Sequence, residues 1–318
     1  MANELERSKR IVIDKDFEDK INPENLKLLA KHERDMDMRG LADGTIYGYV
    51  RDLKQFLAYL VREQFNPLVL DLIDKDIEDF IYYCKKQGNN ENRMLHRITS
   101  IAMFYKFLKR KKIIKEDPME FIVRPKKGLP VVVQTYLTEV QYADMRNKLS
   151  ECGDLQLQTF GMFAISTMAR VTALSNTTWE QIDFENRVVE DVLEKEGKIV
   201  TLYFSEEVCE LLQMLKKERE KEGVDCKYVF ISKSNDEYNS MTANGLRRWA
   251  KKIGEMIGEP TLHPHDFRHS GSQLLNLAGM PIETISSLLS HSGLDVTKNH
   301  YLRENKQKMR EQKDKFSI

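Results

Sequence analysis

The chain has 318 residues, of which 41% are hydrophobic and 31% charged, and its formal net charge is zero at pH 7. This length accommodates two domains with separate cores, and this composition is typical of a folded protein rather than a disordered one. No apolar run reaches the roughly 20 residues that span a bilayer, and the N-terminus lacks a signal peptide's apolar stretch, so we expect a cytoplasmic protein.

The first part of the chain is predicted to be helical. Residues 1–22 mix charges without a clear period, which favours an N-terminal arm. From Pro23, at a helix-opening position, to residue 123, apolar residues recur at helical spacing and no strand alternation is found. Helices are expected to begin near Asn22 and at Thr45 and to cover about residues 76–86 and 90–112, which predicts an α-helical bundle.

The end of this bundle is basic, although the whole chain is neutral. Between Lys85 and Lys127 the sequence has thirteen Lys and Arg against four Asp and Glu. A solvated helix end would explain such a run, but its continuation to Lys127 also fits a face that contacts nucleic-acid phosphates. The candidate DNA-binding residues here are Lys109, Arg110, Lys112, Arg124, Lys126 and Lys127.

Residues 124–134 are predicted to be a linker, because two prolines and a glycine within them disfavour regular structure. A second domain is then expected over residues 135–318. Thr138 is a good N-cap for its first helix.

An arginine follows the most apolar helix of the second domain. This helix is expected over Phe160–Met168, and Arg170 comes directly after it. A buried arginine is usually paired or bound to a ligand, because an unpaired buried charge is costly. A structural salt bridge and a ligand contact both remain open for Arg170.

The middle of the second domain is predicted to contain a β-hairpin. Residues 188–204 alternate and are rich in β-branched side chains, with a glycine-containing turn between Lys195 and Lys198. Lysine commonly decorates solvated hairpin tips, so the pattern alone gives neither lysine a role. A short strand is expected at Tyr228–Ile231, followed by a loop.

Thr242 is predicted to cap a further helix. Its Arg247 and Arg248 are candidate contacts to a DNA backbone, together with the lysines that follow them.

Five of the seven histidines lie between His263 and Tyr301. Such clustering is hard to explain by packing, because histidine is costly to bury and titrates near neutral pH. His265 and Arg268 share one face of a helix expected over Asp266–Ala278.

A second helix is expected after Gly279, which can end the first, and Pro281, which can open the next. It covers about residues 282–289. His291 follows directly, and Tyr301 comes ten residues later in a polar segment.

The ordered set His265-x-x-Arg268, His291 and Tyr301 resembles the C-terminal signature of the tyrosine recombinases, the phage integrase family. The segment around Arg170 is similar to the family's Gly-x-Arg-x-Ser/Thr-Glu-Leu element, and residues 41–60 look like its SAM-like core-binding domain. The resemblance covers about residues 25–305.

Three departures from the family pattern are visible. The tyrosine follows the second histidine by ten residues instead of nine. Met168 replaces the usual glycine, and Ala173 replaces the usual acid. The last departure puts in doubt the carboxylate that supports the family's arginine, but not Arg170 itself.

The resemblance implies a mainly α fold. It combines an N-terminal α-helical core-binding (SAM-like) bundle with an α+β catalytic domain that has a small antiparallel sheet. The expected limits are 1–22 for the arm, 23–123 for the core-binding domain, 124–134 for the linker and 135–318 for the catalytic domain with its C-terminal tail.

The resemblance also implies a site-specific DNA recombinase. Tyr301 would attack the scissile phosphate and leave a 3′-phosphotyrosine, while Arg170, Arg268, His265 and His291 hold the phosphate oxygens. The family's lysine ends the first strand of the hairpin, which favours Lys195 over Lys198 as the general acid. The reaction is expected to need no metal, ATP or other cofactor.

The implied partner is double-stranded DNA with specific core sites. A homotetramer on DNA is expected, with the charged tail after Tyr301 docked on a neighbouring protomer, and accessory proteins are among the expected partners. No membrane partner is expected, and the location would be the nucleoid.

Three other interpretations remain open on the sequence. A type IB topoisomerase would use the same chemistry, and a non-catalytic DNA-binding protein could keep the fold. A zinc site at His263, His265 and His269 is disfavoured, because no cysteine pair or carboxylate cluster completes it and Arg268 would repel the ion.

Overall fold

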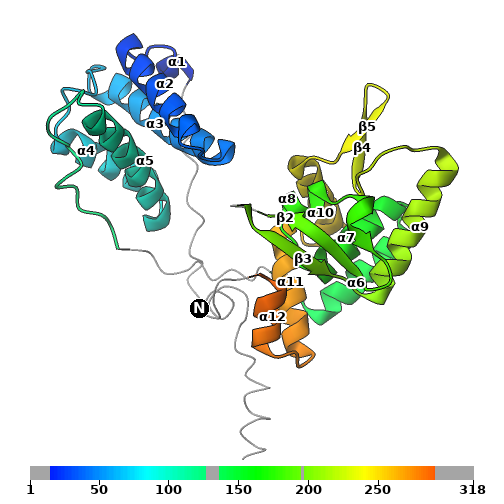
Figure 1. Cartoon of the computed structure of the whole chain (residues 1–318). Helices are drawn as coiled ribbons and strands as arrows, with labels where there is room; N and C mark the ends of the chain where they lie inside the picture. The colour runs from blue at the N-terminus through cyan, green and yellow to red at the C-terminus, as the bar shows by residue number, and fades with distance from the viewer. Residues whose placement is uncertain (1–14, 127–135, 195–196, 291–318) are drawn as a thin grey trace, which may run out of the picture. The chain divides into compact units, whose positions relative to one another are not determined.

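The computed structural model describes residues 15–126, 136–194 and 197–290 (Figure 1). The chain divides into two compact units, with the boundary between residues 133 and 134. Within the described residues, no helix is both long and apolar enough to cross a membrane.

Over the residues that the structure describes, the N-terminal unit contains helices and no strand. Its helices are α1 (Lys15–Glu18), α2 (Pro23–Met38), α3 (Asp43–Glu63), α4 (Asp74–Lys86) and α5 (Glu91–Arg110). Helix α1 packs against α3, and Ile21, which lies before the expected domain start at residue 23, is only 3% exposed.

Side-chain caps explain where α2 and α5 begin. The Asn22 side chain accepts a hydrogen bond from Glu24 N at 3.0 Å, and the Asn90 side chain accepts one from Arg93 N at 2.9 Å. Helix α3 begins two residues earlier than the Thr45 start that the sequence predicts.

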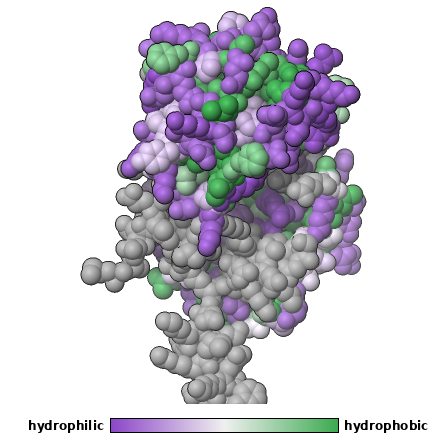
Figure 2. Space-filling view, turned by 90° about the vertical axis from the view of Figure 1, so that its left-hand side faces the viewer, coloured by the Kyte–Doolittle hydropathy of each residue, from purple (hydrophilic) through white to green (hydrophobic). Residues whose placement is uncertain are grey.

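The core of the N-terminal unit joins all four long helices. Phe56 of α3, Phe80 of α4 and Tyr105 of α5 are almost fully buried in it. The Tyr105 hydroxyl donates to the Val69 carbonyl at 2.8 Å, which ties the α3–α4 connection to α5. This unit faces the viewer in Figure 2, where its mostly hydrophilic surface is interrupted by groups of hydrophobic residues.

The second unit packs helices around a small antiparallel sheet, which confirms the predicted fold class. Its helices are α6 (Glu139–Glu151), α7 (Leu155–Thr167), α8 (Val171–Asn176), the 3-10 helix η1 (Trp179–Gln181), α9 (Glu206–Glu222), α10 (Ala243–Met256), α11 (Pro264–Leu277) and α12 (Ile282–Leu288). Helix α7 is central, because it packs against α6, α9, α11 and strand β3 (Ile199–Tyr203).

The main sheet has the order β1 (Ile182–Asp183), β2 (Val188–Leu193), β3, and both pairs are antiparallel. Strand β2 contains a bulge: Val189 pairs with Leu202, but Val192 pairs with Val200. One extra residue therefore lies in β2, at a point where Asp191 has a φ of 52°.

The loop expected after Ile231 is instead a second hairpin. Strand β4 (Ile231–Ser234) pairs with β5 (Glu237–Ser240), and the strand expected at Tyr228–Ile231 is reduced to an isolated bridge from Tyr228 to Thr178. Asn235 and Asp236 form the turn with φ values of 50° and 61°, as two-residue hairpin turns of this kind require. The polar composition of this hairpin hides it from a search for hydrophobic alternation.

Candidate active site

Arg170 stands at the junction of α7 and α8. Met168 ends α7 in a left-handed conformation with a φ of 54°, and Arg170 then occupies the N-cap position of α8. Glycine adopts this conformation most easily, which gives the position a physical reason to be glycine in the family pattern. Here Met168 adopts the left-handed conformation, and its side chain packs with Ile285 and Leu289.

A carboxylate from the hairpin holds Arg170. Glu194, the residue after β2, forms an ion pair with the Arg170 guanidinium, and the glutamate side chain is 2% exposed while that of Arg170 is 36% exposed. The bulge in β2 makes this possible, because it shifts the alternation so that Val192 and Glu194 point inward and Leu193 outward. Sequence reasoning missed Glu194, which supplies the carboxylate that Ala173 cannot.

Helix α11 carries the His265 and Arg268 pair. Gly271 lets this helix approach α7 closely, since a β-carbon there would clash with the Ile165 carbonyl oxygen. Arg268 is 2% exposed and donates from Nη1 to the Met168 carbonyl at 2.7 Å and from Nη2 to the Leu289 carbonyl at 2.6 Å. Arg268 thus connects the ends of α7 and α12.

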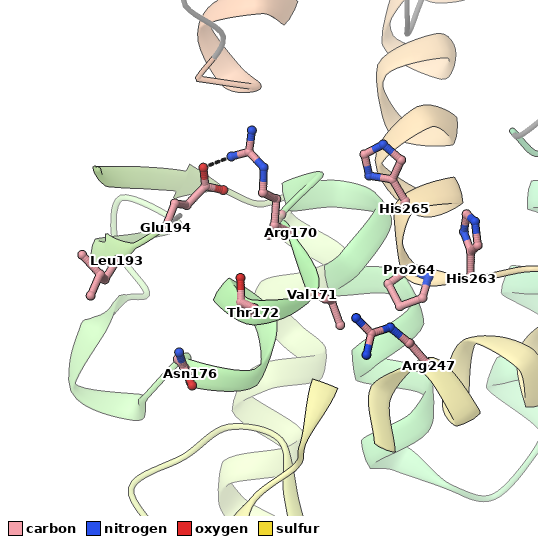
Figure 3. A pocket seen from close by; sticks show the side chains of 11 residues that line it. Arg170, Val171, Thr172, Asn176, Leu193, Glu194, Arg247, His263, Pro264 and His265 are labelled. Atoms are coloured by element: carbon pink, nitrogen blue, oxygen red, sulfur yellow. Dashed lines mark hydrogen bonds and ion pairs between the residues drawn. The ribbon is translucent and has the colours of Figure 1, made fainter. Parts of the chain in front are cut away.

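Arg170, Glu194 and His265 line one open cavity of about 540 Å³, together with Arg247 of α10 and His263. In Figure 3, Arg170 lies between Glu194, to which it is joined, and His265. Arg268 is not among the lining residues and lies one helical turn from His265. The structure therefore brings Arg170 and His265 to the cavity wall, with Arg268 behind it.

The histidines of α11 favour their neutral form. Packing of the surrounding protein lowers the pKa of His265 below its ordinary value, and the nearby Arg268 charge lowers that pKa further. Burial lowers the pKa of His269 to about 4, and its ring meets that of His265 edge to face at a centroid distance of 4.6 Å. A neutral His265 is able to accept a proton near pH 7.

The residue before β3 contacts the end of α12. Lys198 donates from Nζ to the Ser290 carbonyl at 2.6 Å. Lys195, His291 and Tyr301, which complete the predicted catalytic set, lie outside the described residues.

The predicted DNA-binding residues fall into two groups. Arg247 and Arg248 are exposed on α10, and Arg247 reaches the cavity. Arg110 pairs with Asp35, and Lys109 lies 4.0 Å from Glu120, so part of the basic charge at the end of α5 is already matched. Lys112, Arg124 and Lys126 are exposed, and Lys127 lies outside the described residues.

The alternative zinc site does not assemble where the structure is described. No group of three His, Cys, Asp or Glu residues there could hold a metal ion. His263 instead lies 2.8 Å from the Asp266 carboxylate, which also accepts a hydrogen bond from the His263 backbone N–H at the start of α11.

Two family models match this chain. The model described as the phage integrase family matches residues 135–308, and the model of the phage integrase N-terminal SAM-like domain matches residues 36–112. The chain belongs to the phage integrase family. It is a tyrosine recombinase: a site-specific recombinase that cuts and rejoins DNA strands through the 3′-phosphotyrosine chemistry general to this family. The predicted family and function are confirmed.

Individual relatives are distant. The chain is 27% identical over 276 residues to "Tyrosine recombinase XerC" of Leptospira interrogans. The aligned region covers 86% of this chain and 87% of the relative. Its fold is similar to that of the Tn1549 transposon integrase in complex with transposon right end DNA, with a TM-score of 0.64 and 18% identity. The match covers 92% of this chain and 99% of the integrase chain. It is also similar to XerH site-specific recombinase bound to palindromic difH substrate, with a TM-score of 0.68 and 15% identity. That match covers 86% of this chain and 80% of the XerH chain.

Proposed function

We propose that the cavity beside Arg170 receives the scissile phosphate of a DNA strand. The observation that carries this proposal is the convergence of Arg170 and His265, which come from elements far apart in the sequence, on one open cavity. A guanidinium binds phosphate oxygens with two parallel hydrogen bonds and stays charged at any working pH.

The two arginines have different parts in this proposal. Arg170 is partly exposed and held on one side by Glu194, so its free edge contacts the phosphate directly. Arg268 is buried and donates to two carbonyls, so in the described state it fixes the ends of α7 and α12 and adds positive charge behind the phosphate.

Tyr301 is the proposed nucleophile. Its phenol attacks phosphorus, the bond to the 5′ oxygen breaks, and that oxygen leaves with a proton from Lys195. His265, which its lowered pKa keeps in the neutral form, accepts the tyrosine proton, and His291 donates a hydrogen bond to a non-bridging oxygen. The Lys198 contact with the Ser290 carbonyl favours Lys195 as the acid, because it gives Lys198 a structural partner.

The remaining residues serve DNA binding in this proposal. Residues 23–123 and 135–318 form the two DNA-binding units, joined by the linker at 124–134. The backbone contacts come from Lys109, Arg110, Lys112, Arg124, Lys126, Lys127, Arg247 and Arg248. The substrate is double-stranded DNA with specific core sites, held by a homotetramer in the nucleoid, with accessory proteins where the site requires them.

Covalent capture tests the chemistry. A nicked duplex that loses its short 5′ fragment after cleavage should trap the unaltered chain on a DNA 3′ end, visible as a slower band in a denaturing gel. Tyr301→Phe should bind the duplex and trap nothing. A covalent adduct that survives in Tyr301→Phe would remove Tyr301 from the mechanism.

A further inference from the structure

The N-terminal unit has an open cavity of about 880 Å³ beside α5. Residues 70–74, which connect α3 to α4 and begin α4, form one wall, and residues 113–121, which follow α5, form the other. Tyr105 of α5 contributes to the lining between them and is held by its hydrogen bond to the Val69 carbonyl. We refer to this cavity as the N-terminal cavity.

Large apolar side chains of both walls are exposed to solvent. Phe121 is 76% exposed and Ile73 is 58% exposed, and Leu70 and Ile113 are also exposed. Beneath them, Leu72 and Tyr105 belong to the core of the unit. Apolar residues scattered singly over a surface are ordinary, but their collection around one cavity is typical of a binding surface.

The charged residues of the N-terminal cavity are mostly acidic. Lys115 is the basic residue among the lining residues that the structure describes. The acidic ones are Asp71, Asp74, Glu116, Asp117 and Glu120. The lining therefore has five carboxylates against one ammonium group.

Most of these carboxylates are not matched by a cation. Among the described residues of the cavity, Glu120 is the one carboxylate with a basic side chain within ion-pair distance, since Lys109 lies 4.0 Å from it. Carboxylates elsewhere on this unit differ: Asp35 lies within ion-pair distance of both Arg110 and Lys111. The uncompensated negative charge repels DNA phosphates, so the N-terminal cavity is not a surface for nucleic acid.

We propose that the N-terminal cavity binds a basic amphipathic helix of another protein. Such a helix presents apolar side chains at every third or fourth position, which would cover the exposed apolar residues of the two walls. Its lysines and arginines would lie beside the unmatched carboxylates, and this charge complementarity selects a basic helix over an acidic one. The proposal goes beyond the phosphate site and does not depend on it.

A second copy of the chain fits this cavity less well. The basic end of α5 is its most similar described segment, but Phe107 and Leu108 there are buried in the core of their own unit. That segment therefore offers positive charge without an apolar side chain to insert.

Binding of a model helix to the full chain tests the proposal. The probe is a fluorescein-labelled peptide of about 18 residues, five helical turns, with leucines along one face and lysines elsewhere. Fluorescence anisotropy should show saturable binding of this peptide. A peptide with glutamate in place of lysine, and one with the same composition but its leucines spread around the helix, should bind at least about tenfold more weakly.

Substitutions of exposed residues locate the peptide on the chain. Phe121→Ser should weaken binding about tenfold or more, as expected for the loss of an aromatic anchor. Tyr82→Ser is the matched control, because Tyr82 is an exposed aromatic residue of α4 that does not line the cavity. Asp71→Asn with Glu116→Gln should make binding less sensitive to KCl. Each variant should keep the circular dichroism spectrum and the DNA affinity of the unaltered chain.

Four results would overturn the proposal. The first is peptide binding that is equal in Phe121→Ser and Tyr82→Ser. The second is equal binding of the lysine and glutamate peptides. The third is a loss of DNA affinity in Phe121→Ser, which would assign the cavity to DNA. The fourth is self-association of the unaltered chain in sedimentation experiments that Phe121→Ser abolishes, which would assign it to a second copy.

Discussion

Removing Arg170 should cost much more stability than removing Glu194, although the two side chains form one ion pair. Arg170→Ala leaves Glu194, which is 2% exposed, as a buried carboxylate without its cation. The cost of such a group is about 3–5 kcal/mol of the free energy of unfolding. Glu194→Ala leaves Arg170, which is 36% exposed and can turn to water, so its cost should be only about 1 kcal/mol.

The catalytic effect of Glu194 should exceed its effect on stability. Glu194 does not touch the phosphate in our proposal; it holds Arg170 in the orientation that does. A misplacement of a catalytic group by about 1 Å costs roughly 100-fold in rate, so Glu194→Ala should slow single-turnover cleavage by roughly that factor. DNA affinity should change little. Glu194→Gln keeps the shape and one acceptor oxygen and should recover part of the rate.

Urea unfolding followed by circular dichroism gives the stabilities, and a suicide duplex gives the cleavage rates. The double variant Arg170→Ala/Glu194→Gln provides an internal check, because removing the stranded charge should restore stability lost in Arg170→Ala. Equal destabilisation by Arg170→Ala and Glu194→Ala, or no gain in the double variant, would refute the reasoning from burial. A normal cleavage rate in Glu194→Ala would refute its positioning role.

Two further predictions concern the general acid and the response to acid. Lys195→Ala should slow cleavage by roughly 100-fold, and a duplex with sulfur at the bridging 5′ position should restore the rate, because a thiolate leaves without a proton; restoration in Lys198→Ala alone would show that Lys198 is the acid. Burial lowers the pKa of His32 to about 4. As the pH falls below 6.5, the unfolded chain therefore takes up a proton at this residue before the folded chain does. The stability contributed by neutral His32 is lost at up to about 1.4 kcal/mol per pH unit between pH 6.5 and 4. His32→Phe, which keeps the packing on Phe104 and Phe107, should flatten this part of the pH profile relative to the exposed His96→Phe control, and parallel profiles would contradict the assignment.

Local signals in the sequence were sufficient to predict the starts of four helices. Asn22, Asn90, Thr138 and Thr242 each cap a helix as their residue type predicts. These signals act through the nearest backbone N–H groups, so no knowledge of the rest of the chain is needed. Helix α3 begins at Asp43 with no side-chain cap, two residues before the Thr45 start that the sequence predicts.

The residues that sequence reasoning missed depend on long-range geometry. Strict alternation counted from the buried Val189 places Glu194 on the outer face of the hairpin, and only the bulge reverses this. Arg110 likewise reads as a free basic residue until Asp35, 75 positions earlier, is found beside it.

The C-terminal end of α12 connects these observations to the chemistry. Arg268 of α11 donates to the Leu289 carbonyl, and Lys198 of the hairpin donates to the Ser290 carbonyl. The same hairpin holds Arg170 through Glu194, and Arg268 also holds Met168, two residues before Arg170. The residues directly before His291 are therefore fixed by the same two elements that position Arg170. A shift of the hairpin would move Arg170 and Ser290 together, so their relative placement is set by short-range interactions rather than by the long chain between them.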